Sequence, residues 1–203
     1  MRTMKSRILL SMVFFLMLFA YIGCVATKSK VYINPNVNFR FVKKVGVLPF
    51  ENFTNDRFAD KKVRDIFVTT LLASEMVEVP ELGELLQVIN SINLAASEPG
   101  QEKVKGTITK EVAKELGQAL KIQGVVLGNV EEYSIVRSGA GSYPEVSLSL
   151  RMIDAKTGAI IWAISHTEKG NRILPSILGI GEGTVTETAI KACKKIVETL
   201  IYK

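Results

Sequence analysis

The first 26 residues decide which part of this chain can fold as a globular domain. Arg2, Lys5 and Arg7 precede an uncharged run of 19 residues, from Ile8 to Ala26. A basic segment followed by an apolar one is typical of a secretory leader. We therefore expect the folded part to follow this leader and to lie outside the cytoplasm.

The leader ends in Tyr21-Ile22-Gly23-Cys24, which resembles a bacterial lipobox. In that motif a small residue precedes a Cys that is diacylated and becomes the first residue of the mature protein. The resemblance implies a signal peptide over residues 1–23 and lipidation of Cys24. A diacyl chain supplies two membrane anchors, which is enough for stable attachment. Val25 stands where the inner-membrane retention signal has Asp, so we expect the outer membrane, with the domain facing the periplasm.

Two other interpretations of the leader stay open. Cys24-Val25-Ala26 has small residues at the positions that an ordinary signal peptidase requires. Alternatively, the uncharged run remains uncut as a membrane anchor, since a spanning helix needs about 20 residues.

Removal of the leader changes the charge of the chain and the interpretation of its cysteines. Without residues 1–23 the formal net charge falls from +6 to +3, and the basic residues form no stripe. We therefore expect no nucleic-acid binding.

Acylation of Cys24 leaves Cys193 without a disulfide partner. The position of Cys193 among aliphatic residues at helical spacing indicates a small core residue.

The remaining length fits one domain with a short appendage. Residues 24–42 contain Pro and three Asn without clear periodicity, which predicts a lipidated tether. The domain is expected over residues 43–203, starting with an apolar run that Pro49 ends and that predicts a buried strand.

Hydrophobic periodicity predicts four helices, starting near Ala59, Pro80 and Thr109 and ending with residues 184–201. Strands are predicted at 43–50, 77–79, 124–130, 146–152 and 160–164, and a hairpin turn is predicted at 154–158. The clearest strand is 146–152, where apolar residues alternate with Ser147, Ser149 and Arg151. The order β-α-β-α-α-β-β-β-α indicates an α+β class, a layered domain with a mixed sheet.

Three segments resemble the CsgG-like and TolB-N-terminal-like family of bacterial lipoproteins: 45–52, the pair 111–117 and 124–133, and 151–162. The family includes the curli secretion channel CsgG and the penicillin-binding-protein activator LpoB. The resemblance implies a TolB-N-terminal-like fold. It also implies a non-enzymatic, lipid-anchored envelope protein that binds protein partners in cell-envelope assembly or secretion.

The alternative function is a ring-forming, CsgG-like secretion channel subunit. Such a channel needs two amphipathic hairpins, with about 9–11 residues in each membrane-spanning strand. The corresponding segment Ser134–Glu145 is rich in Gly, Ser and Pro, and Ser165–Gly183 is interrupted by Pro175 and Gly. We therefore expect neither segment to supply barrel strands.

Catalytic chemistry finds little support in the sequence. The single His, His166, follows an apolar strand and is expected to be structural or exposed, with no Ser or Cys indicated beside it. No His, Cys and Asp cluster has metal-ligand spacing. The glycines at 179, 181 and 183 lack the Lys-Ser/Thr that a phosphate loop requires. We predict no catalytic residue, no cofactor and no metal.

One apolar segment stands out as a candidate contact surface. Residues 173–180 contain five aliphatic side chains without clean periodicity: Ile173, Leu174, Ile177, Leu178 and Ile180. They either pack under the final helix or form an exposed patch. Exposed apolar patches often mark contacts with a partner or with a second copy of the chain.

Overall fold

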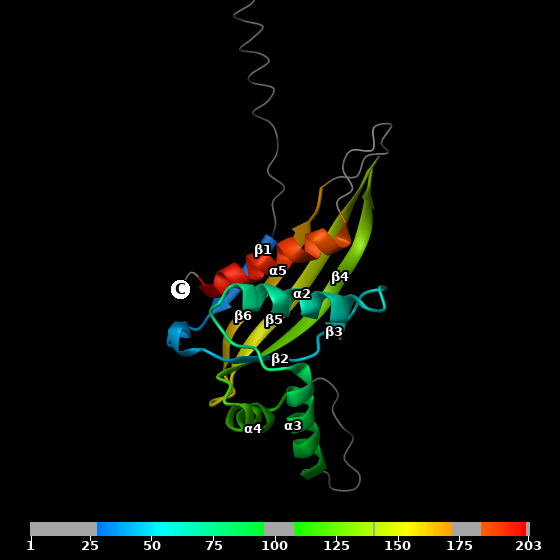
Figure 1. Ribbon diagram of the computed structural model, residues 1–203. Helices are drawn as coiled ribbons and strands as arrows, with labels where there is room; N and C mark the ends of the chain where they lie inside the picture. Colours follow the sequence, from blue (N-terminus) through cyan, green and yellow to red (C-terminus); the bar gives the residue numbers. More distant parts are fainter. Residues whose placement is uncertain (1–27, 96–107, 140, 172–183, 202–203) are drawn as a thin grey trace, which may run out of the picture.

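The computed structural model describes residues 28–95, 108–139, 141–171 and 184–201. Within these ranges six strands form one mixed sheet, accompanied by four α-helices and a short 3-10 helix (Figure 1). The elements are β1 Lys28–Ile33, η1 Phe39–Phe41, β2 Val45–Val47, β3 Glu51–Asn52, α2 Ala59–Ala73, α3 Leu82–Ala95, α4 Lys110–Leu120, β4 Gly124–Ser138, β5 Gly141–Asp154, β6 Ile160–Lys169 and α5 Val185–Ile201. The predicted α+β class with a mixed sheet is confirmed.

The sheet has the strand order β1-β6-β5-β4-β2, and β3 also pairs with β4. β2 and β3 run parallel to β4, while the other pairs are antiparallel. The predicted strand at 77–79 is reduced to one bridge between Lys44 and Glu78. Pro80 follows it directly and has no N–H to extend the ladder.

The prediction of a tether over residues 24–42 is wrong from residue 28 onward. β1 pairs with β6 along its whole length, from Lys28 opposite Thr167 to Ile33 opposite Trp162. Val37, Phe39 and other apolar side chains after β1 then pack against the core. The fold therefore includes the segment from Lys28, because the edge of β6 gives β1 a partner.

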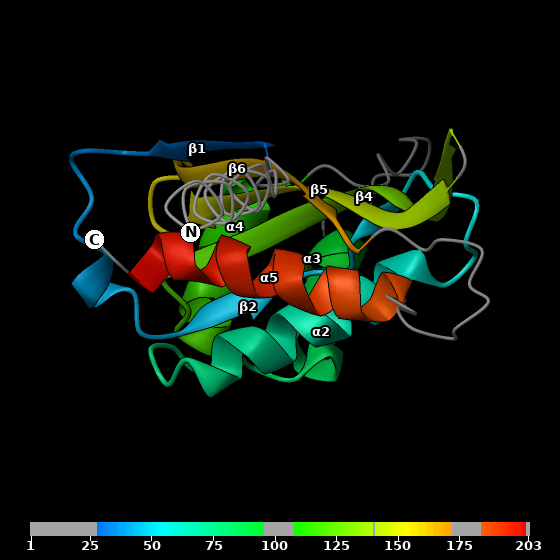
Figure 2. The ribbon, with the colours of Figure 1, turned by 90° about the horizontal axis from the view of Figure 1, so that it is seen from above.

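Helices α2 and α5 cover one face of the sheet (Figure 2). The side chains between the helices and the sheet form the main core, with Phe67 of α2, Ile196 of α5 and Trp162 of β6 all fully buried. The Trp162 Nε1–H donates to Thr199 Oγ1 at 3.1 Å, which satisfies the only polar atom of that side chain.

Helices α3 and α4 cover only one end of the opposite face. Leu85 of α3 and Leu116 of α4 pack there on Val125 and neighbouring residues in a second, smaller core. α4 begins at the side-chain cap of Thr109, whose hydroxyl accepts from the Val112 N–H at 3.3 Å.

The predicted turn at 154–158 is confirmed. Asp154 Oδ1 accepts from the backbone N–H groups of Lys156 and Thr157, and Gly158 has φ +72. That positive φ favours Gly. A register shift lies beside the turn, between Met152 and Ile153, and Ile160 is exposed there although Trp162 is fully buried.

The hairpin of β4 and β5 is longer than predicted. β4 runs to Ser138 and β5 starts at Gly141, with Ser134 opposite Glu145. The predicted strands 124–130 and 146–152 are therefore too short, and the expectation that 134–145 supplies no barrel strands stays a prediction. Continuous pairing with the neighbouring strand outweighs the weak strand propensity of Gly, Ser and Pro here.

Candidate functional site

Among the described residues, the face of the sheet opposite α2 and α5 is open beyond α3 and α4, and it carries a groove. The groove has a volume of about 390 Å³, within the range typical of binding sites. Strands β1, β4, β5 and β6 line it with Lys30, Val31, Tyr32, Leu127, Asn129, Ser149, Leu150, Arg151, Ala163, Ile164 and Ser165.

Strand register explains why this surface is hollowed. Ala163 lies between Tyr32 on β1 and Arg151 on β5. In the next row Ser165 lies between Lys30 and Ser149. Because β6 presents small side chains between larger ones, its neighbours form the walls of a groove and β6 forms the floor.

Hydroxyl groups order the part of the face beyond the groove. Ser149 donates to Glu131 Oε1 at 2.6 Å, and Ser147 donates to Glu131 Oε2 at 3.3 Å. The Ser147 and Thr167 hydroxyls lie 3.1 Å apart. These contacts satisfy the Glu131 carboxylate and hold the side chains in place. The groove lining itself contains two cations, Lys30 and Arg151, and no carboxylate.

A second polar cluster lies on the helix-covered face around His166, which is 1% exposed. His166 Nε2 lies 3.1 Å from Glu168 Oε2, and Ser29 Oγ lies 2.5 Å from His166 Nδ1. A carboxylate only accepts, so Nε2–H donates to Glu168 and Nδ1 of the neutral ring accepts from Ser29. The structure thus brings a Ser beside His166, contrary to the sequence-based expectation.

The hydrogen-bonded series Ser29, His166, Glu168 contains the residue types of a hydrolase triad, but His166 turns Nδ1 to the Ser and Nε2 to the carboxylate, which is the reverse of a Ser-His-Asp triad. Its surroundings differ as well. Lys195 of α5 donates to both Glu168 carboxylate oxygens, at 3.0 and 2.8 Å. The groove opens on the other face of the sheet and Ser29 does not line it. Burial lowers the pKa of His166, and the hydrogen bond to Glu168 opposes this. The cluster joins β1, β6 and α5.

Cys193 is fully buried on α5, as predicted for a core residue. Burial raises the pKa of its thiol to about 12, so the thiol is protonated at neutral pH. Nowhere in the described ranges do three or more His, Cys, Asp or Glu side chains gather in a way that could hold a metal ion. Each helix within those ranges is too short or too polar to span a bilayer.

The predicted lipidation residue and the predicted contact patch lie outside the described residues. This applies to Cys24, Ile173, Leu174, Ile177, Leu178 and Ile180, and also to the glycines at 179, 181 and 183. The residues that flank the patch on either side contact the β4–β5 hairpin. Gly170 N–H donates to the Pro144 carbonyl at 2.8 Å, and the Thr186 hydroxyl lies 3.1 Å from that of Tyr133. Both contacts are made with the β4–β5 hairpin.

Sequence reasoning missed the groove because one of its walls, formed by Lys30 and Tyr32 of β1, falls in the predicted tether. A signal was present, since Lys30 and Tyr32 alternate with Val31 and Ile33 over residues 30–33. The polar residues Ser147, Ser149 and Arg151 did indicate that one side of β5 faces solvent.

A layered domain with one covered and one partly open sheet face has solved counterparts. No family model matches the chain, and no curated protein matches it in sequence. A point-variant PelC dodecamer from Paraburkholderia phytofirmans is 18% identical and covers 88% of this chain and 100% of that chain, with a TM-score of 0.59. A second PelC dodecamer from that organism gives a TM-score of 0.56 at 18% identity, covering 86% of this chain and 97% of that one.

Lipoprotein GNA1162 from Neisseria meningitidis is also similar, at 16% identity and a TM-score of 0.47, covering 79% of this chain and 99% of that chain. Because the PelC structures alone among these exceed a TM-score of 0.5, the shared fold rests on them. The more specific resemblance to CsgG stays a prediction.

Proposed function

We propose that this chain is a lipid-anchored envelope protein that binds protein partners in cell-envelope assembly or secretion, and that it does so without catalysis. The observation that supports this best is the open sheet face with its groove. The leader ending in Cys24 supports a lipid anchor, and Val25 supports the outer membrane, with the domain facing the periplasm.

The groove suits a protein partner for two reasons. Its floor is built from strands, so it is preorganised and binding costs little ordering of the site. Its walls combine an aromatic ring at Tyr32 with a guanidinium at Arg151. Tyr and Arg are the residue types that are enriched at the energetic centres of protein interfaces.

The proposal of no catalysis has its own test, because Ser29, His166 and Glu168 are the residue types of a hydrolase triad. We expect the purified chain to show no hydrolysis of ester or amide substrates. Activity that Ser29→Ala and His166→Ala both abolish would reverse this part of the proposal. The expectation rests on the ion pair between Glu168 and Lys195 and on the position of the groove on the other face.

In-cell photocrosslinking tests the binding face directly. We would place p-benzoylphenylalanine at Tyr32, which is 50% exposed in the groove wall, and at Phe58, which is 49% exposed at the start of α2. The two positions match in aromatic character and exposure. We expect a partner protein crosslinked from position 32 and not from position 58. Equal capture from both positions, or capture from 58 alone, would contradict the proposal.

A second candidate is a ring of identical subunits, of which the CsgG-like channel subunit is one form. It is favoured by the likeness in fold to PelC, whose solved structures are dodecamers. Native mass spectrometry of the acylated chain in detergent tests it, with a single high oligomer expected for a ring and a monomer for the first proposal. Conductance across a planar bilayer would separate a channel from a closed ring.

We further propose that Ile173, Leu174, Ile177, Leu178 and Ile180 contact a partner or a second copy. Ile177→Asp and Leu178→Asp are expected to reduce assembly without lowering the melting temperature. A loss of fold stability in both variants would instead assign these side chains to the core. The matched control is Ile190→Asp on α5, which is 49% exposed.

A further inference from the structure

The start of the sheet limits how far the fold can stand from its anchor. Lys28 is the first residue of β1, so three residues separate it from Cys24. Four fully extended residue steps span at most about 14 Å. If Cys24 carries its lipid at the bilayer surface, Lys28 lies within that distance of the membrane. An uncut leader ending at Ala26 would hold Lys28 closer still.

The β4–β5 hairpin extends from the same end of the sheet at which β1 begins. Lys28 lies opposite Thr167, and Thr167 lies opposite Ser147 of β5. From Ser147 back to Gly141, β5 continues for a further six residues, or about 20 Å at 3.3 Å per residue. Figure 1 shows the hairpin rising beyond the start of β1. Sheet twist shortens this projection. The hairpin end therefore extends beyond Lys28 by about the distance that the connection to Cys24 can span.

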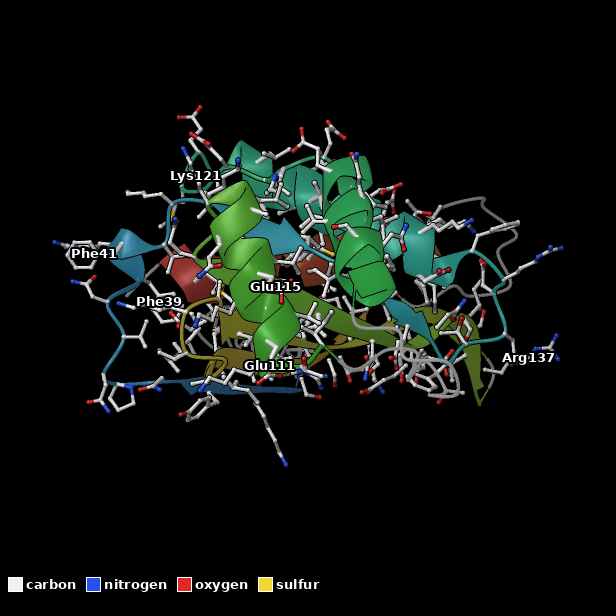
Figure 3. All side chains as sticks on the ribbon, turned by 90° about the horizontal axis from the view of Figure 1, so that it is seen from below. Phe39, Phe41, Glu111, Glu115, Lys121 and Arg137 are labelled. Atoms are coloured by element: carbon white, nitrogen blue, oxygen red, sulfur yellow. The ribbon has the colours of Figure 1, made fainter. Side chains whose placement is uncertain are left out.

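The chemistry of the hairpin end suits a headgroup layer. Arg137, Ser138 and Gly139 are exposed, and the described residues from 136 to 143 include no carboxylate. In Figure 3 Arg137 points away from the body of the domain, at the opposite side from Phe41. Lys169 donates to the Tyr143 hydroxyl at 3.3 Å, lies 4.9 Å from its ring centroid and pairs with Glu145 Oε2 at 3.1 Å. Tyrosines and cations of this kind are favoured at membrane interfaces.

We propose that this hairpin end, residues 137–139 and 141–143 with Lys169, lies in the headgroup layer of the membrane that holds the anchor. Arg137 faces the lipid phosphates, and the open face of the sheet is held beside the bilayer. The inference rests on the proposed lipid anchor. It adds to that function a fixed orientation, which a long tether would not give.

Depth-dependent quenching tests the orientation on the full acylated chain. We would label Ser138→Cys or, as the distal control, Glu115→Cys on α4 with an environment-sensitive fluorophore; the buried thiol of Cys193 leaves each labelling site selective. The chain is reconstituted in phosphatidylethanolamine and phosphatidylglycerol vesicles containing headgroup-nitroxide lipid. We expect at least threefold stronger quenching at 138 than at 115. Equal quenching, or stronger quenching at 115, would overturn the proposal.

A longer connection to the anchor provides the second measurement. Ten Gly and Ser residues inserted between Ala26 and Thr27 add about 17 Å of root-mean-square reach. We expect this insertion to lower the quenching at position 138 at least twofold while the chain stays bound. Unchanged quenching would show that the short connection does not hold the hairpin end down, and would overturn the inference.

The intact mass of the chain shows whether Cys24 is acylated, and this separates failure of the proposed anchor from failure of the proposed orientation. A chain that carries no lipid and stays in the aqueous phase overturns both the anchor and the orientation. A chain that is acylated and vesicle-bound, with no difference between positions 138 and 115, overturns the orientation alone and leaves the proposed function standing.

Discussion

The two faces of one sheet differ sharply in what they carry. On the side of α2 and α5, the alternating residues of β5 and β6 include Leu148 and Trp162, both fully buried. On the other side the same strands present Ser149, Arg151 and Ser165 around a groove. Antiparallel strands allow one face to be packed and the other to face water. The comparison teaches that stability and binding can be assigned to different side chains of the same strands.

The largest expected effect separates the faces by stability. Trp162→Ala should lower the free energy of unfolding by about 3–5 kcal/mol, because it opens a cavity in the main core and removes a satisfied indole. Tyr32→Ala on the groove wall should cost less than about 0.5 kcal/mol. Urea denaturation of the two variants measures the contrast, and similar losses would contradict the assignment of stability to the covered face.

A buried carboxylate, Glu168, and an exposed one, Glu131, offer a comparison of the same kind. Glu168→Gln on the covered face should destabilise the fold by about 1–3 kcal/mol, because the buried His166 and the exposed Lys195 ammonium lose a charged acceptor. Glu131→Gln on the open face should cost less than about 1 kcal/mol, since its partners are hydroxyls near water. Thermal unfolding at neutral pH checks both, and a larger loss for Glu131→Gln would break the comparison.

Two glycines compare the packing density at the covered face with that at an exposed position of α3. A Cβ at Gly128 would lie 2.6 Å from Phe50 Cδ1 and closer still to Leu150 Cδ2. Gly128→Ala should therefore cost about 1–3 kcal/mol through overpacking. A Cβ at Gly83 meets nothing within 4 Å, so Gly83→Ala should stabilise α3 by up to about 1 kcal/mol. Thermal unfolding followed by circular dichroism measures the loss of stability in Gly128→Ala and the gain in Gly83→Ala.

The pH dependence of stability sharpens the contrast in the polar clusters. Burial lowers the pKa of His166 below its ordinary value of 6.5, while Glu168 favours and Lys195 disfavours the charged ring. As the pH falls, His166 therefore takes up a proton in the unfolded chain before it does so in the folded one. The contribution of neutral His166 to the free energy of unfolding is complete above pH 6.5 and falls as the pH drops below that value. His166→Asn should flatten this part of the profile. A wild-type profile that rises as the pH falls from 6.5 would contradict the assignment.

The sequence predicted the covered face well and the open face poorly. Helical spacing identified the buried side of α2 and α5, and alternation identified β5, because both follow from local periodicity. The cluster of Ser29 and His166 could not be found this way, since the two residues are 137 positions apart. β1 was missed because Pro and Asn dominate the segment around it, and its strand state depends on the free edge of β6.

The length of the hairpin was missed for a related reason. Pro144 and the nearby glycines lower the local strand propensity, yet Ile135 opposite Pro144 keeps the ladder in register. Pairing between strands outweighs propensity in such cases. Lipidation of Cys24 was predicted from a motif and the contact patch at 173–180 from composition, and both remain predictions.

The most direct test of the central claim fills the groove while sparing the core. Ser165→Trp places a large side chain on the exposed floor of the groove. We expect its melting temperature to stay within about 2 °C of the wild type, while capture of the partner from a photocrosslinker at position 32 falls at least fivefold. Undiminished capture at an unchanged melting temperature would contradict the account that the open face is the binding face.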